Sequence, residues 1–310
     1  MSRLEDYARQ SRYTDPGPYA ALFDPLPASD VGEVAAVVRN VLVHYRAAGI
    51  EFTGERLNEI DHRWVERILA TDQDRFAWPL ATARPEDQRV VGCCRDFTLL
   101  TVAALRRHGV PARSRIGFAA YFASDFWCDH VVVEYWNGRR WVWADAQLDP
   151  SRDWGFDTCD LPRDLGAARP SGSPVFASAA QVWTAYRRGE IDVEKYGVDP
   201  ALPIRGGAFV RNYVLHELAH RQRDELLLWD DWGAMGGELR GSELGLIDEV
   251  AALLLAADDG EIAAENELVA RYAADPRLNP GDRVQCVSPS GLRAPVDLAR
   301  PRDHEDLAGV

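Results

Sequence analysis

Two adjacent cysteines, Cys93 and Cys94, stand at the start of a segment whose pattern predicts a helix. The run CRDFTLLTVAALRRH begins at Cys94 and is followed by Gly109, a typical helix stop. A thiol at a helix N-terminus lies near the positive end of the helix dipole, which lowers its pKa and favours the nucleophilic thiolate. Successive helical side chains point about 100° apart, so only one of the two cysteines can face a given partner. The spacing alone does not decide which one.

A histidine and an aspartate are predicted to meet on a hairpin further along the chain. Two strand-like runs in DHVVVEYWNGRRWVWADAQ flank Asn137 and Gly138, the dipeptide typical of a two-residue type I′ turn. With these two residues in the turn, His130 faces Asp145 across the hairpin, with Cβ atoms roughly 4.5–5.5 Å apart. A carboxylate at that position can orient the imidazole as a general base. An ordinary exposed cross-strand pair is the competing interpretation, but the upstream cysteines supply the nucleophile that a catalytic set would need.

The segments GCCRDFTLLTVAALRRHGVPARSRIGFAAYF and DHVVVEYWNGRRWVWADAQLD together resemble the core of the transglutaminase-like superfamily, within the wider papain-like cysteine group. The shared pattern is a Gly-x-Cys helix start, a G-[IV]-P-A-R turn, a histidine that opens one strand and an aspartate that closes the next. Gly92, Cys93 and Cys94 match the helix start, so the resemblance implies that Cys94 is the nucleophile and Cys93 the intervening residue. It implies a catalytic triad of Cys94, His130 and Asp145. The remaining matches are Gly109 to Arg113 and Trp141, and the resemblance covers only residues 90–150.

The resemblance implies an α+β fold, a papain-like or transglutaminase-like core with helices packed on an antiparallel sheet and a helical C-terminal extension. The implied chemistry is acyl transfer or amide hydrolysis through a thioester on Cys94, acting on a peptide or small-molecule amide or thioester, with no cofactor and no metal. Backbone N–H groups around Cys94 are the expected oxyanion donors. Trp78 and Gln147 are candidates for the lining of the cleft. Related cores include peptidases, amide hydrolases, amide-forming enzymes and catalytically silent binding proteins, so the substrate stays open.

The resemblance is to a stand-alone member of bacterial type. The calcium-dependent animal transglutaminases carry additional β-sandwich domains, and this chain has no room for them after the catalytic core. It also has no clear acidic calcium loop. Protein crosslinking is therefore not implied.

A second motif points to different chemistry. HELAH, residues 216–220, matches the H-E-x-x-H pattern in which two histidines bind zinc and the glutamate acts on a bound water. A zinc site needs a third ligand, and a distal acid such as Glu238 or Glu243 would have to serve. We favour His216, Glu217 and His220 as the polar flank of an amphipathic helix. A zinc metallopeptidase that uses these three residues remains the alternative function.

The chain divides into three predicted parts. Residues 1–160 form the catalytic core with N-terminal helices, residues 161–275 a helical extension packed on the core, and residues 276–310 an extended tail. Apolar periodicity predicts helices at about 29–45, 54–71, 94–108, 178–188, 208–228, 243–258 and 261–274.

Composition limits the classes of partner. The 310 residues are 46% hydrophobic, enough for a substantial core, and the net charge of −14 argues against nucleic acid. No apolar run is long enough to cross a bilayer and no secretory leader is recognisable, so we expect a cytoplasmic protein with no membrane partner. The five cysteines form no CxxC pair and are expected to be free thiols. The oligomeric state is not predicted.

Overall fold

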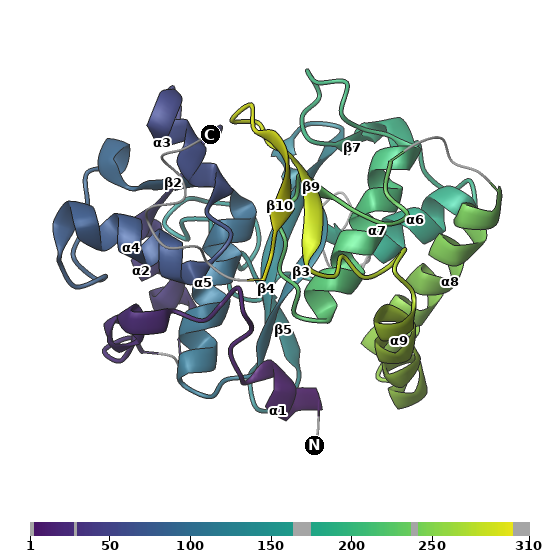
Figure 1. The fold of residues 1–310 in the computed structure, drawn as a ribbon, viewed down its shortest axis with the longest axis horizontal. Coiled ribbons are helices and arrows are strands. Elements are labelled where there is room, and N and C mark those ends of the chain that lie inside the picture. Colours follow the sequence, from purple (N-terminus) through teal and green to yellow (C-terminus); the bar gives the residue numbers. More distant parts are fainter. Residues whose placement is uncertain (1–2, 28–29, 164–174, 237–240, 300–310) are drawn as a thin grey trace.

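A curved five-stranded sheet lies at the centre of the molecule (Figure 1). The computed structural model describes residues 3–27, 30–163, 175–236 and 241–299, without the side chains of 241–243. The strand order is β5-β4-β3-β6, antiparallel throughout, and the short β7 pairs in parallel with one end of β4. The strands are β3 (Ala112–Ala123), β4 (Phe126–Trp136), β5 (Trp141–Ala144), β6 (Phe176–Ser178) and β7 (Tyr196–Gly197).

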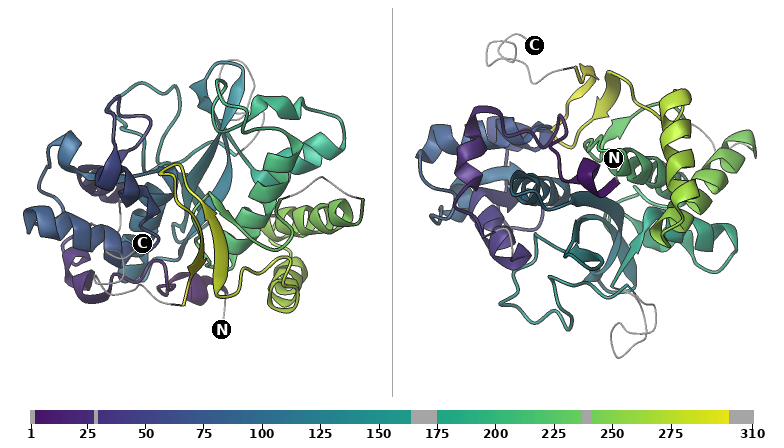
Figure 2. Two further views of the ribbon diagram at one scale, coloured as in Figure 1. Left: turned by 45° about the horizontal axis from the view of Figure 1, so that its top comes forward. Right: turned by 90° about the horizontal axis from the view of Figure 1, so that it is seen from below.

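Helices cover both sides of this sheet (Figures 1 and 2). One side carries α2 (Val31–Val41), α3 (Gly54–Asn58), α4 (Val65–Phe76) and α5 (Cys94–Arg107), and the other side carries α6 (Ala179–Arg187), α7 (Gly207–Arg221), α8 (Gly241–Asp258) and α9 (Ile262–Ala274). The short α1 (Arg3–Tyr7) lies beside β5, where the Tyr7 ring contacts Trp141 and the Tyr7 hydroxyl donates to the carbonyl of Arg221. Short 3₁₀ helices span Gly17–Phe23, Glu59–Asp61, Glu86–Gln88 and Val193–Lys195. The packing of α5 on β4 and of α7 on β3 joins the two groups through the sheet. This mixture of helices and an antiparallel sheet is the predicted α+β fold.

Two smaller sheets complete the fold. The first is a parallel pair, β1 (Leu42–His44) and β2 (Val90–Gly92), which stands directly before α5. The second joins β8 (Asp230–Asp231), β9 (Arg283–Val287) and β10 (Arg293–Asp297) in antiparallel order. None of the helices in the described ranges is both long and apolar enough to cross a bilayer.

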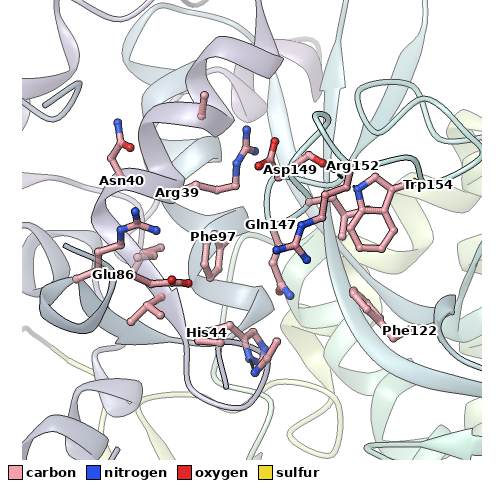
Figure 3. Close-up of a pocket in the computed structure, with 17 residues that line it drawn as sticks. Arg39, Asn40, His44, Glu86, Phe97, Phe122, Gln147, Asp149, Arg152 and Trp154 are labelled. Atoms are coloured by element: carbon pink, nitrogen blue, oxygen red, sulfur yellow. Dashed lines mark hydrogen bonds between the residues drawn. The ribbon is translucent and has the colours of Figure 1, made fainter. Parts of the chain in front are cut away.

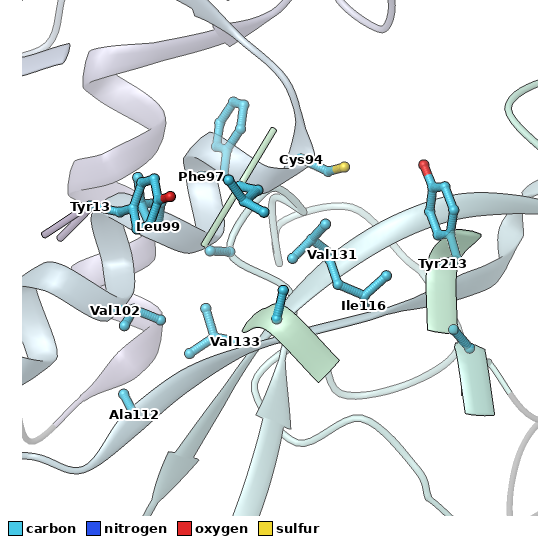
Figure 4. Packing of buried hydrophobic residues seen from close by; sticks show 14 of the residues in the cluster. Tyr13, Cys94, Phe97, Leu99, Val102, Ala112, Ile116, Val131, Val133 and Tyr213 are labelled. Atoms are coloured by element: carbon cyan, nitrogen blue, oxygen red, sulfur yellow. The ribbon is translucent and has the colours of Figure 1, made fainter. Parts of the chain in front are cut away.

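The helix α5 is buried along almost its whole length. Every residue from Cys94 to Arg106 is buried, because α2 packs on one side of the helix and β4 on the other. Figure 4 shows Phe97 and Leu99 of this helix beside Val131 and Val133 of β4. Its polar residues find partners inside the core, as where the Thr98 hydroxyl donates to the carbonyl of Val131 at 2.9 Å. A helix held on all sides gives its first residue a fixed position.

Several predicted helices are confirmed. The helix that begins at Cys94 ends before Gly109, whose φ of +73° is the left-handed conformation that favours glycine after a helix. Ser178 caps α6, since its hydroxyl accepts from the N–H of Gln181 while the Gln181 side chain accepts from the N–H of Ser178. The helices predicted near 243–258 and 261–274 are α8 and α9.

Other predicted boundaries are wrong. The helix expected at about 29–45 ends at Val41, and Leu42–His44 form β1 instead. The helix expected at about 54–71 is broken between Asp61 and Val65. The helix expected at 208–228 ends at Arg221. Within the segment 276–310, for which an extended tail was expected, β9 and β10 form a hairpin, and its pairing with β8 satisfies backbone groups that would otherwise bond to water.

Candidate active site

The strand β2 ends at Gly92, directly before the two cysteines at the start of α5. Cys93 is the N-cap, and its N–H donates to Asp96 Oδ2 at 2.8 Å, one half of a capping box. Gly92 is required before it, because a Cβ at that position would lie 2.9 Å from Asp96 Oδ2. Cys94 is the first helical residue, where backbone N–H groups have no partner within the helix. Its thiol therefore lies at the positive end of α5.

His130 and Asp145 form a buried hydrogen-bonded pair. The His130 Nε2 to Asp145 Oδ2 distance is 2.7 Å. The carboxylate also accepts from the hydroxyl of Tyr121 at 2.5 Å and from the N–H of Gln147 at 3.0 Å. Because Asp145 takes Nε2, the ring nitrogen left to face Cys94 is Nδ1. The aspartate is thus held by three donors and in turn holds the imidazole.

The hairpin register that was expected to bring this pair together is wrong by two residues. The strands pair Trp136 with Trp141, so Gly138 and Arg139 occupy the turn rather than Asn137 and Gly138. Gly138 has φ +91°, as the first residue of a type II′ turn requires, and the Asn137 side chain accepts from the backbone N–H of Arg139 at 3.0 Å.

The contact survives the shifted register. A shift of two residues keeps every side chain on its own face of the sheet. Asp145 lies one residue beyond β5 and reaches His130 along the diagonal rather than directly across.

Hydrogen bonds lower the pKa of Cys94 well below that of an ordinary thiol. The largest contribution is a hydrogen bond from the Cys93 thiol; hydrogen bonds from His130 and His44 and the charge of His130 add to it, and together they outweigh the opposing effect of burial. Burial opposes the charged imidazolium of His130, but the Asp145 carboxylate and Cys94 raise the pKa of His130 to about 10. These shifts favour a thiolate–imidazolium pair.

Cys93 has a part that the sequence did not indicate. Its thiol donates to Cys94, and this hydrogen bond together with burial raises the pKa of Cys93 well above the ordinary value. The residue that the resemblance gave only as the intervening one thus contacts the candidate nucleophile. It stays protonated while Cys94 is charged.

His44 is a further side chain at the site that sequence reasoning missed. Its Nδ1 accepts from the backbone N–H groups of Arg46 and Ala47 at 3.1 and 3.2 Å, so the ring proton is on Nε2. His44 pairs with Gly92 in the β1–β2 sheet, two residues before Cys94, and hydrogen-bonds to that thiol. No local motif marks it, because the position depends on pairing between segments almost fifty residues apart.

A cavity of about 580 Å³ adjoins the candidate site on the side of His44 (Figure 3). Its lining includes His44, Phe97 and Phe122, and the Phe122 ring lies 4.9 Å from that of His130, measured between centroids. Gln147 lines the cavity, as expected. Trp78 does not line it; this side chain is 44% exposed, and its ring lies tilted against that of Phe76, 5.0 Å between centroids.

The HELAH segment lies in α7 and is buried. His220 Nε2 donates to the carbonyl of Leu226 at 3.1 Å and Nδ1 accepts from the Ser114 hydroxyl at 2.7 Å, so both ring nitrogens are occupied. Burial lowers the pKa of His216 to about 3, and Glu217 accepts from Arg115 at 2.9 Å. No group of three possible metal ligands occurs within the described ranges. The side chains of Glu238 and Glu243, which were expected to supply a third ligand, lie outside those ranges.

The segment that carries this site matches a known protein family. Residues 62–146 match the Transglutaminase-like superfamily. The matched segment contains Cys94, His130 and Asp145 and runs from the start of α4 to the end of the hairpin. The match covers this segment of the chain and supports a cysteine-based enzyme at the level of the superfamily.

Among solved structures, the chain is similar to a crystal structure of a proposed cysteine protease from Cytophaga hutchinsonii, with 19% sequence identity and a TM-score of 0.33. The similarity covers 57% of this chain and about half, 51%, of that protein. No curated protein matches the sequence at a significant level.

Proposed function

We propose that the protein is an enzyme of thiol-dependent acyl transfer or amide hydrolysis, with Cys94 as nucleophile, His130 as general base and acid, and Asp145 as the group that orients the imidazole. The observation that supports this most is the continuous contact from the Cys94 thiol through the His130 ring to the Asp145 carboxylate, at 2.7 Å for the last step. The superfamily match supports the more general statement that the protein is a cysteine-based enzyme.

The chemistry follows in two steps. The Cys94 thiolate attacks the acyl carbonyl and forms a C–S bond, while the His130 imidazolium gives its proton to the leaving amine or thiol as that bond breaks. A thioester on Cys94 and a neutral imidazole remain. Water or an acceptor amine then loses a proton to His130 and attacks the thioester, the C–S bond breaks, and the thiolate–imidazolium pair is restored.

His44 is the side chain we assign to the negative oxygen that develops on the attacked carbonyl. Its Nε2–H is directed to Cys94, because Nδ1 is fixed as the acceptor of two backbone N–H groups. The backbone N–H of Cys94, at the first position of α5, would supply the second donor. Such donors act when they are held in place before the reaction, and β1 holds His44 beside β2.

Acylation by an activated ester tests the proposal. The protein is incubated with p-nitrophenyl acetate, and intact mass and peptide mapping locate any acetyl group. We expect one acetyl group on Cys94 of the wild-type protein and of Cys93→Ala, and none on Cys94→Ala. The acetyl group should leave when an amine acceptor is added. An acetyl group on Cys93, or an adduct that persists in Cys94→Ala, would refute the assignment of the nucleophile.

A further inference from the structure

Three arginines line the cavity beside Cys94, and each comes from a different segment. Arg39 belongs to α2, Arg89 stands just before β2, and Arg152 follows β5. Figure 3 shows Arg39, Arg152 and His44 around one opening. The cavity is also lined by His44, which hydrogen-bonds to Cys94, so the three cations lie in the cavity that reaches this side of the candidate site.

None of the three forms an ion pair within the part of the chain that the structure describes. Arg39 donates to the carbonyl of Ala146 at 3.1 Å, and Arg89 donates to the carbonyl of Arg84 at 3.2 Å. The Arg152 side chain is exposed and makes no hydrogen bond among the described residues, whereas its backbone N–H donates to the carbonyl of Asp149 at 3.1 Å. Partial burial lowers the pKa of both Arg39 and Arg89, and it outweighs the opposing charges of Asp149 near Arg39 and of Glu86 near Arg89.

Arg39 and Arg89 are half-buried and Arg152 is exposed, whereas several fully buried arginines form ion pairs. Arg84 contacts Asp72 at 2.8 Å and Arg106 contacts Glu225 at 2.9 Å. The difference matters in a chain with a net charge of −14, where carboxylates are plentiful. Guanidinium groups left unpaired on a cavity wall are available to a ligand.

Two acids, Glu86 and Asp149, share the lining, yet neither pairs with the arginines. Asp149 Oδ1 accepts from the backbone N–H of Ser151 at 2.9 Å, and Glu86 is exposed. Three cations against two anions leave the lining positive. The rest of the wall is largely apolar, with the rings of Phe97, Phe122 and Trp154.

We propose that this cavity takes an acyl donor whose acyl group has an apolar body and ends in an oxyanion, a carboxylate or a phosphate, bound by Arg39, Arg89 and Arg152. The planar fork of a guanidinium matches both kinds of anion. The inference rests on the proposed function, because it takes Cys94 as the nucleophile that meets the other end of the acyl group. It adds the chemical class of the substrate.

Paired alkylating probes test the inference. Each anionic probe is an N-iodoacetyl amino acid, from glycine to 6-aminohexanoate, and its neutral partner is the corresponding methyl ester; a second series replaces the carboxylate by a phosphonate and its dimethyl ester. The measured quantity is the ratio of Cys94 alkylation rates, anionic over neutral, at each spacer length. We expect a ratio of at least about fivefold at the best length, as one charge-assisted contact would give, and a fall with added salt. The faster series identifies carboxylate or phosphate.

Three variants control the measurement. The ratio should fall toward one in Arg39→Gln and in Arg152→Gln, and Arg152 provides the cleaner variant because its side chain makes no hydrogen bond within the described structure. Arg293→Gln, on the exposed strand β10, removes the same charge far from the cavity and should keep the ratio. A ratio of one or less at every length in the wild type overturns the inference. Absence of labelling by the anionic and neutral probes alike overturns the proposed function as well.

Discussion

The Cys94 thiol is 5% exposed, yet its surroundings favour the charged form. Burial by itself would keep a thiol protonated. Three donors outweigh that effect, namely the Cys93 thiol, the His130 ring and the His44 ring. Of these three residues, only Cys93 is a neighbour of Cys94 in the sequence. The other two come from β4 and β1 and depend on how the chain folds back beside α5.

The role of His44 can be separated from that of a simple thiolate stabiliser. In His44→Gln we expect acetylation of Cys94 by p-nitrophenyl acetate to slow about 100-fold, the usual effect of losing one oxyanion donor. Alkylation by iodoacetamide should slow much less, because it passes through no oxyanion. Equal losses in the two rates would contradict the assignment. His108→Gln is the matched control, since His108 lies beyond the end of α5 and contacts the carbonyl of Phe23 at 2.9 Å.

At the scale of elements, the sequence predicts α5, α6, α8 and α9 and misses β1. A helix with a buried stripe and a cap or glycine stop carries its own evidence, as Ser178 and Gly109 do. The strand Leu42–His44 continues an apolar pattern that fits a helix, and only its pairing with Val90–Gly92 makes it a strand. Tertiary pairing of this kind has no local signature, which is why His44 could not be predicted.

The hairpin shows a different limit. The dipeptide Asn137-Gly138 predicts a turn at that place, and the turn is there, but the Asn137 side chain caps it and moves the two turn residues on by one. Side chains alternate between the two faces of a sheet, so the prediction that His130 and Asp145 share a face holds for any register shift of an even number of residues. The observed register differs from the predicted one by two residues, so the two side chains still share a face and form the hydrogen bond.

The buried histidines of α7 predict a pH dependence of stability. The pKa of His216 is lowered to about 3, while an unfolded histidine has its ordinary value near 6.5. Below pH 6.5 the unfolded chain therefore binds a proton that the folded chain refuses, so the free energy of unfolding falls as the pH falls toward 3. The loss at pH 5 should be about 2 kcal/mol for this residue.

Urea unfolding of wild type and His216→Phe at pH 7, 6 and 5 measures this effect. Phenylalanine keeps a ring beside Trp232, whose centroid lies 4.9 Å from the His216 ring, and removes the buried Nδ1, which has no partner among the described residues. We expect the variant to lose about 2 kcal/mol less than wild type between pH 7 and pH 5. An unchanged pH dependence would contradict a neutral, buried His216.

At the scale of the whole molecule, buried charges join the sheet to the C-terminal helices. Arg115 of β3 contacts Glu217 of α7 at 2.9 Å and Asp258 of α8 at 2.8 Å, and Arg221 contacts the same Asp258 at 2.7 Å. Glu134 of β4 lies on the other side of Arg115 at 3.7 Å. One guanidinium thus compensates carboxylates from three elements, and its loss would leave them buried together.

Removal of that guanidinium should be costly. We expect Arg115→Ala to lower the free energy of unfolding by about 3–5 kcal/mol, because the buried carboxylates lose their main counterion. Arg271→Ala breaks the solvent-exposed contacts of α9 with Glu249 and Glu267 and should cost at most about 1 kcal/mol. Denaturant unfolding followed by tryptophan fluorescence compares the two variants. Similar losses would mean that the Arg115 cluster does not anchor the helices.

The measurement that bears most directly on the central claim is the pH dependence of Cys94 alkylation by iodoacetamide, in wild type and in His130→Ala. We predict that wild-type Cys94 stays reactive at pH 6, where it should react roughly 10- to 100-fold faster than a thiol of ordinary pKa, and that His130→Ala moves the inflection of the profile up toward that ordinary value. Peptide mapping separates Cys94 from Cys93, whose raised pKa should keep it unlabelled. A wild-type inflection at the ordinary thiol pKa, or identical profiles for the two proteins, would contradict the claim that His130 activates Cys94.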